Sequence, residues 1–252
     1  MRLSVLGASG RIGRLVVECA ERFGVPVTGA VSSDGAVSLL FNNADAIIDF
    51  SAPEATVEML KLALHRRSMV PIVIGTTGLG KVHEELITSC AGYAPIFHSP
   101  NMSVVVAILN ELVGDVAKAL GPDEFDVEIL EAHHKLKKDA PSGTALMLGH
   151  SVASARDQIF QDVAQFDRVK EATELRKHGE IGFAVIRGGS IVGMHDVSFN
   201  GEFERLSLRH EALDAGIFAT GAVKIARWIV DNHLPPGRYT MNDYVHHILN
   251  TR

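Results

Sequence analysis

The sequence predicts an α/β protein with a largely parallel sheet in its first half, followed by an α+β domain that carries a mixed sheet. Three observations support this fold class. Short apolar runs alternate with helical patterns up to about residue 101, which is typical of a parallel sheet covered by helices. A long, mostly apolar helical pattern follows at 102–120. Glycine-punctuated runs over 181–212 then predict three further strands.

Five apolar runs predict the strands of the first half. They lie at 2–6, 26–33, 44–51, 69–78 and 94–101. Apolar spacing predicts helices at 14–23 and 53–67, the second with Pro53 in its first turn. The link between the second and third strands is short, so we expect its crossover helix to be reduced or missing.

The second half follows a different order. We expect a strand at 125–134, a helix at 142–157 and a largely antiparallel arrangement of the strands in 181–212. A final helix at 216–231 has the apolar spacing to return to the first domain, and the tail after it is rich in turn residues. The predicted domain ranges are 1–104, 105–215 and a returning segment at 216–252.

Composition excludes several classes of function. The 252 residues are 46% hydrophobic and 21% charged, with a net charge of −6, which argues against nucleic-acid and anionic-membrane partners. We find no apolar run of about 18 residues and no signal peptide. Two isolated cysteines, Cys19 and Cys90, fit a reducing compartment, so we expect a cytoplasmic protein.

The motif GASGRIG lies between the first strand and the first helix. Its Gly7, Gly10 and Gly13 allow a tight turn, and the helix start offers unpaired N–H groups to a pyrophosphate. The strand–turn–helix context favours a Rossmann-like dinucleotide-binding domain. The alternative is a structural turn with no ligand.

The end of the second strand bears on the choice of cofactor. NAD enzymes usually carry an acid there, but this strand ends in Ser32, Ser33 and Asp34. Asp34 either reaches a ribose or caps a turn. No arginine adjoins Ser32, although Arg11 in the glycine turn could supply charge to a 2′-phosphate. We therefore expect NADH or NADPH to serve.

Two further motifs end predicted parallel strands. DFS covers Asp49–Ser51, and GTTG covers Gly75–Gly78. Ligands bind at this edge of open α/β sheets, although ordinary loop chemistry explains each motif equally well when it is taken alone.

The stretch EAHHKLKKDAPSGTA concentrates positive charge at 133–138 in an acidic protein. Histidine is the side chain best suited to give up a proton near neutral pH, which makes His133 a candidate acid. Lys137 offers fixed charge to an anion, and Ser142, Gly143 and Thr144 open a helix whose N–H groups can hold a carboxylate. The alternative is a solvated basic loop followed by a capped helix.

Other catalytic patterns are absent from the sequence. None of Tyr93, Tyr239 and Tyr244 has a lysine four residues later, and no metalloprotease HExxH occurs. His246 and His247 lack partner ligands, so we expect no metal site.

Read in order, the glycine turn, DFS, GTTG, PNMS at 100–103 and EAHHKLKKDAPSGTA resemble the 4-hydroxy-tetrahydrodipicolinate reductase family, formerly called dihydrodipicolinate reductase. The resemblance spans essentially the whole chain, and the pattern E-x-H-H-x-x-K-x-D-A-P-S-G-T-A is its most specific part. It implies a Rossmann-like dinucleotide-binding domain at 1–104, a substrate-binding and oligomerisation domain at 105–215, and a homotetramer. It also implies NAD(P)H-dependent reduction of a small dicarboxylate in lysine and diaminopimelate synthesis.

The resemblance also implies residue roles. His133 matches the general acid and Lys137 the second catalytic residue. Substrate-binding positions fall on His134, Ser142, Gly143 and Thr144. Cofactor positions fall on Gly7, Gly10, Arg11, Ile12, Gly13, Ser32, Ser33, Asp34, Gly75, Thr76, Thr77, Ser99, Pro100, Asn101, Met102 and Phe218. The chain departs from the family in the Lys135-Leu136 pair and in a shortened 32–44 region without the cofactor acid.

Three other functions fit parts of the pattern. They are a different two-domain Rossmann reductase, a dehydratase-like enzyme that binds nucleotide only structurally, and a non-enzymatic NAD(P)H sensor. Activity on a substrate without paired carboxylates would favour the first.

Overall fold

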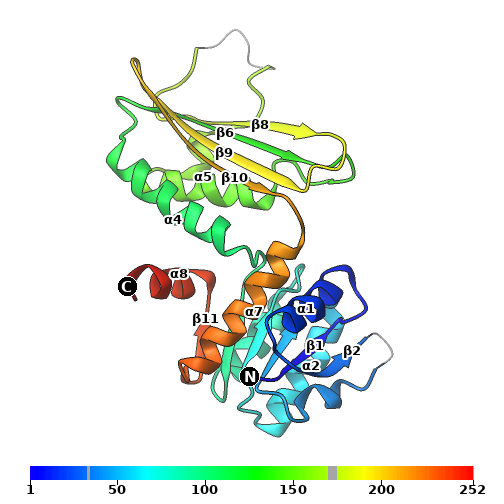
Figure 1. Cartoon of the computed structure of the whole chain (residues 1–252). Helices are drawn as coiled ribbons and strands as arrows, with labels where there is room; N and C mark the ends of the chain where they lie inside the picture. Colours follow the sequence, from blue (N-terminus) through cyan, green and yellow to red (C-terminus); the bar gives the residue numbers. More distant parts are fainter. Residues whose placement is uncertain (33–34, 170–174, 252) are drawn as a thin grey trace. The chain divides into compact units, whose positions relative to one another are not determined.

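The computed structural model describes residues 1–32, 35–169 and 175–251. Figure 1 draws the chain coloured along its sequence. The fold divides into two compact units, one formed by Met1–Val104 with Ala215–Arg252 and the other by Val105–Asp214. The helix predicted at 216–231 therefore belongs to the same unit as the N-terminal strands.

The first unit is built on a six-stranded parallel sheet with the order β11-β5-β4-β3-β1-β2. Its strands are β1 (Leu3–Leu6), β2 (Val27–Val31), β3 (Ala46–Asp49), β4 (Ile72–Ile74), β5 (Pro95–His98) and β11 (Gly237–Tyr239). Every residue of β1 and β3 is buried, as expected for central strands of a parallel sheet covered on both faces. The predicted Rossmann-like sheet is confirmed.

Helices cover both faces of this sheet. They are α1 (Arg11–Arg22), α2 (Pro53–Arg66), α3 (Lys81–Cys90) and α7 (Gly216–Asp231), whereas α8 (Met241–Asn250) contacts α7 through Trp228. Met59 of α2 and Ile87 of α3 share one buried core with Ile47 of the sheet. Helix α7 contacts β3 and β4 of the sheet. It also packs against α1, and the two helices lie side by side in Figure 1.

Two connections of the first unit differ in how well the sequence predicted them. Among the described residues that join β2 to β3, a short 3₁₀ helix, η1 (Val37–Phe41), is the only helix, which confirms the expectation that the crossover helix is reduced or missing. The tail is rich in turn residues, as noted from the sequence, but it also contains a strand and a helix that the sequence did not predict. Its β11 pairs with β5, and Tyr244 of α8 stacks near Trp228 of α7 with ring centroids 5.2 Å apart. A three-residue strand is too short to show a period of two.

The second unit contains a five-stranded mixed sheet with the order β10-β9-β6-β8-β7. Its strands are β6 (Asp126–His133), β7 (Ala164–Gln165), β8 (Ile181–Arg187), β9 (Gly193–Asn200) and β10 (Arg205–Ala212). The mixed sheet is confirmed, but the largely antiparallel arrangement is not. β8 pairs with β6 and β7 in parallel, whereas β9 pairs with β6 and β10 antiparallel.

Helices α4 (Val104–Ala119) and α5 (Gly143–Ala155) lie on the same face of this sheet (Figure 1). Val113 and Leu148 from these helices share a core with Phe199 of β9. A short helix, α6 (Phe160–Val163), follows α5. No helix among the described residues is long and apolar enough to cross a membrane.

The connection between β8 and β9 passes over the end of β6, where the candidate acid His133 lies. Because these strands flank β6 on opposite sides, residues 188–192 must cross the carboxyl end of β6. The Gly188 amide donates to the His133 carbonyl at 3.0 Å, and the Lys135 amide donates to the Gly189 carbonyl at 3.3 Å. The sequence runs of β8 and β9 suggest a hairpin, but the structure places β6 between them.

Candidate active site

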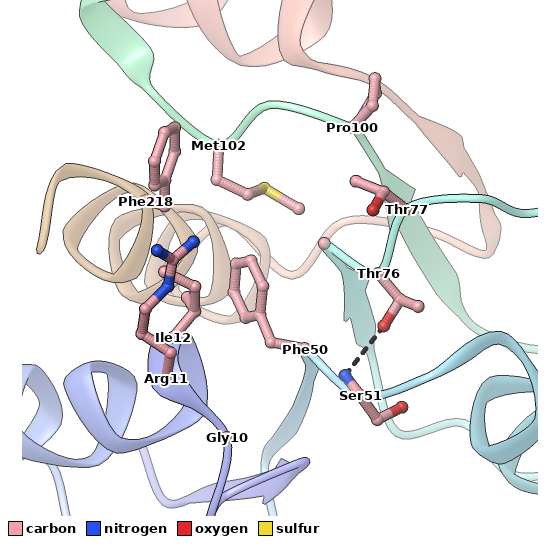
Figure 2. A pocket seen from close by; sticks show the side chains of 11 residues that line it. Gly10, Arg11, Ile12, Phe50, Ser51, Thr76, Thr77, Pro100, Met102 and Phe218 are labelled. Atoms are coloured by element: carbon pink, nitrogen blue, oxygen red, sulfur yellow. Dashed lines mark hydrogen bonds between the residues drawn. The ribbon is translucent and has the colours of Figure 1, made fainter. Parts of the chain in front are cut away.

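A cavity of about 460 Å³ opens at the carboxyl ends of the strands in the first unit. Nine residues predicted to bind cofactor line it: Gly10, Arg11, Ile12, Gly75, Thr76, Thr77, Pro100, Met102 and Phe218. Figure 2 shows Arg11, Phe50 and Met102 directed toward this space. The glycine turn, the GTTG loop, the PNMS segment and α7 therefore meet at one site, although they are far apart in the sequence.

Most of the remaining predicted cofactor residues that the structure describes lie beside this cavity or in the turns that border it. Gly7 and Ser32 line an adjoining cavity of about 270 Å³, which Gly10 also borders. Ser99 is buried, and its hydroxyl donates to the Asn101 carbonyl at 2.7 Å, which shapes the turn before α4. Gly13 packs beneath the glycine turn. Ser33 and Asp34 lie outside the described residues.

The glycine turn has the backbone geometry that a dinucleotide pyrophosphate requires. Gly7 has φ +81°, and a Cβ there would lie 2.4 Å from the Phe50 carbonyl oxygen. A Cβ at Gly13 would lie 2.0 Å from the Gly7 carbonyl oxygen. The first turn of α1 carries no acidic residue, and Gly10 at its start provides no side-chain cap. The helix terminus thus presents N–H groups and positive potential without a competing carboxylate.

A buried aspartate organises the wall of this cavity. Asp49 accepts hydrogen bonds from the Ser51 hydroxyl at 2.5 Å and from the Thr56 hydroxyl at 2.6 Å. The Ser51 amide donates to the Thr76 hydroxyl at 3.0 Å, which ties DFS to GTTG (Figure 2). Burial raises the pKa of Asp49, and these hydrogen bonds oppose that rise.

The second unit gathers a cluster of ionisable groups at the end of β6. His133 Nδ1 lies 2.6 Å from the carboxylate of the fully buried Glu131, two residues earlier on the same strand face. Arg187 at the end of β8 pairs with the same carboxylate at 2.6 Å. The ring of His195 on β9 meets that of His133 edge-on, with centroids 5.2 Å apart.

Burial and charge shift the pKa values in this cluster. Burial lowers the pKa of His133 below its ordinary value, and contact with Glu131 offsets part of that effect. Burial, reinforced by His133, lowers the pKa of His195 to about 4, so this ring is neutral near pH 7. Of the two rings, His133 is better suited to exchange a proton, because a contacting carboxylate opposes the fall of its pKa.

The predicted substrate-binding residues surround the start of α5. Ser142 is the N-cap of this helix, and its hydroxyl accepts from the Ala145 amide and lies 3.0 Å from His195 Nε2. Its own amide donates to Glu131 at 3.0 Å. Gly143 and Thr144 are the first two residues of the helix, so both lie at the positive end of the helix dipole.

The basic segment between β6 and α5 is held by local contacts. Lys137 Nζ pairs with Asp139 at 2.9 Å and lowers the pKa of that carboxyl. The Lys137 amide donates to the His134 carbonyl at 3.1 Å, and this bond forms a turn. His134 has a buried Nδ1 without a hydrogen-bond partner among the described residues. Throughout residues 1–32, 35–169 and 175–251, no three His, Cys, Asp or Glu side chains gather as metal ligands would.

Family models cover almost the whole chain. The model described as "Dihydrodipicolinate reductase, N-terminus" matches residues 1–102, and that described as "Dihydrodipicolinate reductase, C-terminus" matches 105–245. This chain belongs to the dihydrodipicolinate reductase family. The 4-hydroxy-tetrahydrodipicolinate reductase of Zymomonas mobilis is 40% identical over 96% of both chains. That of Cereibacter sphaeroides is 43% identical over 95% of this chain and 96% of its own.

Solved structures agree with this assignment at the level of the fold. A dipicolinate-bound dihydrodipicolinate reductase from Paenisporosarcina sp. TG-14 matches with a TM-score of 0.69 and 21% identity, over 95% of this chain and 97% of its own. A diaminopimelate (DAP) dehydrogenase from C. glutamicum matches with a TM-score of 0.53 and 12% identity, over 100% and 99%. The reductase family thus shares its architecture with other dehydrogenases.

The sequence analysis did not predict several residues of the candidate site in this reductase. Phe50 and Ser51 line the larger cavity, and the DFS motif had already pointed to that edge of the sheet. Glu131 opens the motif that contains His133, at a spacing of two, which places both on one face of a strand. Arg187 and His195 carry no sequence signal, because only the strand register sets them beside His133 and Glu131.

Proposed function

We propose that this chain reduces 4-hydroxy-tetrahydrodipicolinate to tetrahydrodipicolinate with NADH or NADPH, as a step in lysine and diaminopimelate synthesis. Membership of the reductase family makes it an NAD(P)H-dependent oxidoreductase. The observation that carries the assignment of the site is the cluster around His133: a half-buried imidazole backed by a carboxylate, with Lys137 and the opening of α5 nearby.

The proposed roles follow from the chemistry of each group. A bound nicotinamide cofactor supplies the hydride, and the glycine turn with the residues of the larger cavity would hold it. After reduction the substrate ring needs a proton, and His133 is placed to provide it as the general acid. Lys137 and the N–H groups of Gly143 and Thr144 would anchor the two substrate carboxylates.

A direct assay tests the activity. The condensation product of pyruvate and aspartate semialdehyde is added to the protein with NADPH, and loss of reduced-nicotinamide absorbance is followed. We expect rapid oxidation that depends on both components. NADPH binding without oxidation would favour the sensor, oxidation only with substrates lacking paired carboxylates would favour another reductase, and loss of water alone would favour the dehydratase.

The cofactor preference is predicted to be weak. The acid that would repel a 2′-phosphate is absent at Ser32, while Arg11 lines the cavity beside the glycine turn. We expect kcat/KM for NADH and NADPH to differ by less than about tenfold, or 1.4 kcal/mol. Steady-state kinetics with each cofactor measures this. A preference on the order of a hundredfold for NADH would assign the acid's role to Asp34, and the same preference for NADPH would assign a phosphate contact to Arg11.

We also expect a homotetramer built through the second unit. The described helices cover only one face of its sheet, and Ile186 on the other face is 46% exposed in the single chain. Sedimentation at micromolar concentration should therefore give a tetramer, and Ile186→Glu should dissociate it. Met69→Glu, at a position 78% exposed in the first unit, is the control. A stable monomer of the unaltered chain would contradict this prediction.

We expect the enzyme in the cytoplasm. Cys19 and Cys90 are both free and buried, which supports a reducing compartment.

A further inference from the structure

The Glu131 carboxylate is fully buried and is bound at both oxygens. Arg187 donates from its two terminal nitrogens, at 2.8 Å to one oxygen and 2.6 Å to the other. The Ser142 amide donates to one oxygen at 3.0 Å, and His133 Nδ1 lies 2.6 Å from the other. An unpaired buried charge is costly, so this bidentate arginine explains how an ionised carboxylate is kept beside His133.

The contact with Glu131 decides which ring nitrogen exchanges a proton. Burial favours the neutral form of Glu131, but the hydrogen bonds from Arg187, His133 and the Ser142 amide hold the pKa of the carboxyl below its ordinary value. An ionised carboxylate can only accept, so His133 Nδ1 carries hydrogen in both charge states of the ring. The proton that His133 gains and loses is therefore the one on Nε2.

On the opposite side of the ring, Nε2 is bordered by a residue that has no side chain. A Cβ at Gly193, the first residue of β9, would lie only 3.1 Å from His133 Nε2. Because residue 193 is glycine, bare backbone borders the nitrogen that exchanges the proton. The β6–β8 register thus brings Arg187 to Glu131, and the glycine that begins β9 adds no side chain beside Nε2.

We propose that Glu131 and Arg187 are positioning residues for His133: Glu131 fixes Nε2 as the proton-donating nitrogen and stabilises the imidazolium, while Arg187 limits how tightly that proton is held. The inference rests on the proposed function, in which His133 is the acid. It adds two residues with opposite charges: Glu131 strengthens the binding of the Nε2 proton, and Arg187 weakens it.

Other groups around His133 set the background for this effect. Lys137, from the segment after β6, lowers the pKa of His133 as Arg187 does. His195 on β9 is neutral near pH 7, and His210 on β10 lies behind it, with its own pKa lowered by burial. Asp139 is paired with Lys137. Glu131 is the anion in direct contact with the ring, so changes at Glu131 and Arg187 should dominate its titration.

The sign of each effect follows from charge. A general acid must be protonated, so turnover falls as pH rises through the pKa of His133. Glu131→Gln removes the stabilising anion, and the fall should move to lower pH by about one unit or more. Arg187→Met leaves the Glu131 charge unopposed, and the fall should move to higher pH by about one unit.

The experiment measures both the titration and the activity. In the full-length protein, the ring signal of His133 is followed by NMR as a function of pH and assigned by its loss in His133→Ala. The pH profile of kcat is measured in parallel for the same variants. Arg187→Lys keeps the charge and should stay near the wild-type titration. Arg209→Met removes an exposed arginine of the same sheet and should leave it unchanged.

Opposite shifts in the two variants support the proposal, whereas equal loss of turnover with unchanged titration and pH profiles would overturn it. If Glu131→Gln does not fold, Arg187→Met compared with Arg187→Lys still decides, because only the former should raise the pKa. Failure of the proposed function would give a different result. In that case the NMR shifts appear as expected, but the dicarboxylate substrate is not reduced by the unaltered chain.

Discussion

Replacing His133 or Lys137 with alanine should lower turnover by roughly 10²–10⁴-fold, the usual cost of losing a general acid or a charge that stabilises the reacting groups. NADPH affinity should not change, because both residues lie in the second unit and the glycine turn lies in the first. Single-turnover kinetics and fluorescence titration with NADPH would separate the two effects.

Two neighbours of Lys137 provide matched controls. Lys138→Ala removes an exposed lysine from the same segment and should leave turnover near the wild-type value. Asp139→Asn releases Lys137 from its 2.9 Å ion pair without removing the ammonium. If Lys137 serves only to hold Asp139, Asp139→Asn and Lys137→Ala should be equally harmful. Full turnover in both His133→Ala and Lys137→Ala would show that the catalytic assignment is wrong.

Gly13→Ala should damage the first unit and, if the glycine turn holds the cofactor as proposed, weaken cofactor binding. Its added methyl group would sit 2.0 Å from the Gly7 carbonyl oxygen, a backbone atom in the turn that follows β1, which cannot move aside as a flexible side chain could. We expect a loss of about 1–3 kcal/mol in the free energy of unfolding, as in other overpacked sites. NADPH should bind at least about tenfold more weakly, a change of ~1.4 kcal/mol. Calorimetry and fluorescence titration measure these quantities.

Gly114→Ala is the matched control for this prediction. Gly114 also lies within a helix, but a Cβ there meets nothing within 4 Å. Alanine should therefore stabilise α4 by about 0.5–1 kcal/mol, since glycine is a poor helix former. If Gly13→Ala behaves like Gly114→Ala and binds NADPH normally, the glycine turn does not carry the cofactor.

The first unit was predictable because its central strands are buried on both faces. A run such as 46–49 is apolar almost throughout, and its burial follows from composition alone. The helix α3 escaped prediction because only Ile87 and Cys90 in it are buried, which leaves little periodic signal. The strand β11 depends on pairing with β5, and no local pattern within its three residues records that pairing.

The candidate site was predictable only in part, for a similar reason. His133 and Lys137 share one segment, so their spacing is visible in the sequence. Arg187 and His195 reach the cluster through strand register, and Arg187 is 56 residues from Glu131. A glycine-rich link between two strands normally indicates a hairpin. Here residues 188–192 instead cross a third strand, because β8 pairs with β6 and not with β9, and that pairing sets Arg187 beside His133.

The first unit is discontinuous in sequence, and this affects how the protein is made. Ala215–Arg252 supplies α7 and β11 to a sheet whose other strands lie before Val104. During synthesis the amino-terminal strands leave the ribosome first, yet the part of their sheet that α7 contacts stays uncovered until residues 216–231 emerge. The second unit, Val105–Asp214, is continuous, so all its residues are synthesised before α7 and β11 of the first unit. The unit that contains the glycine turn therefore cannot be completed until residues beyond the second unit have been made.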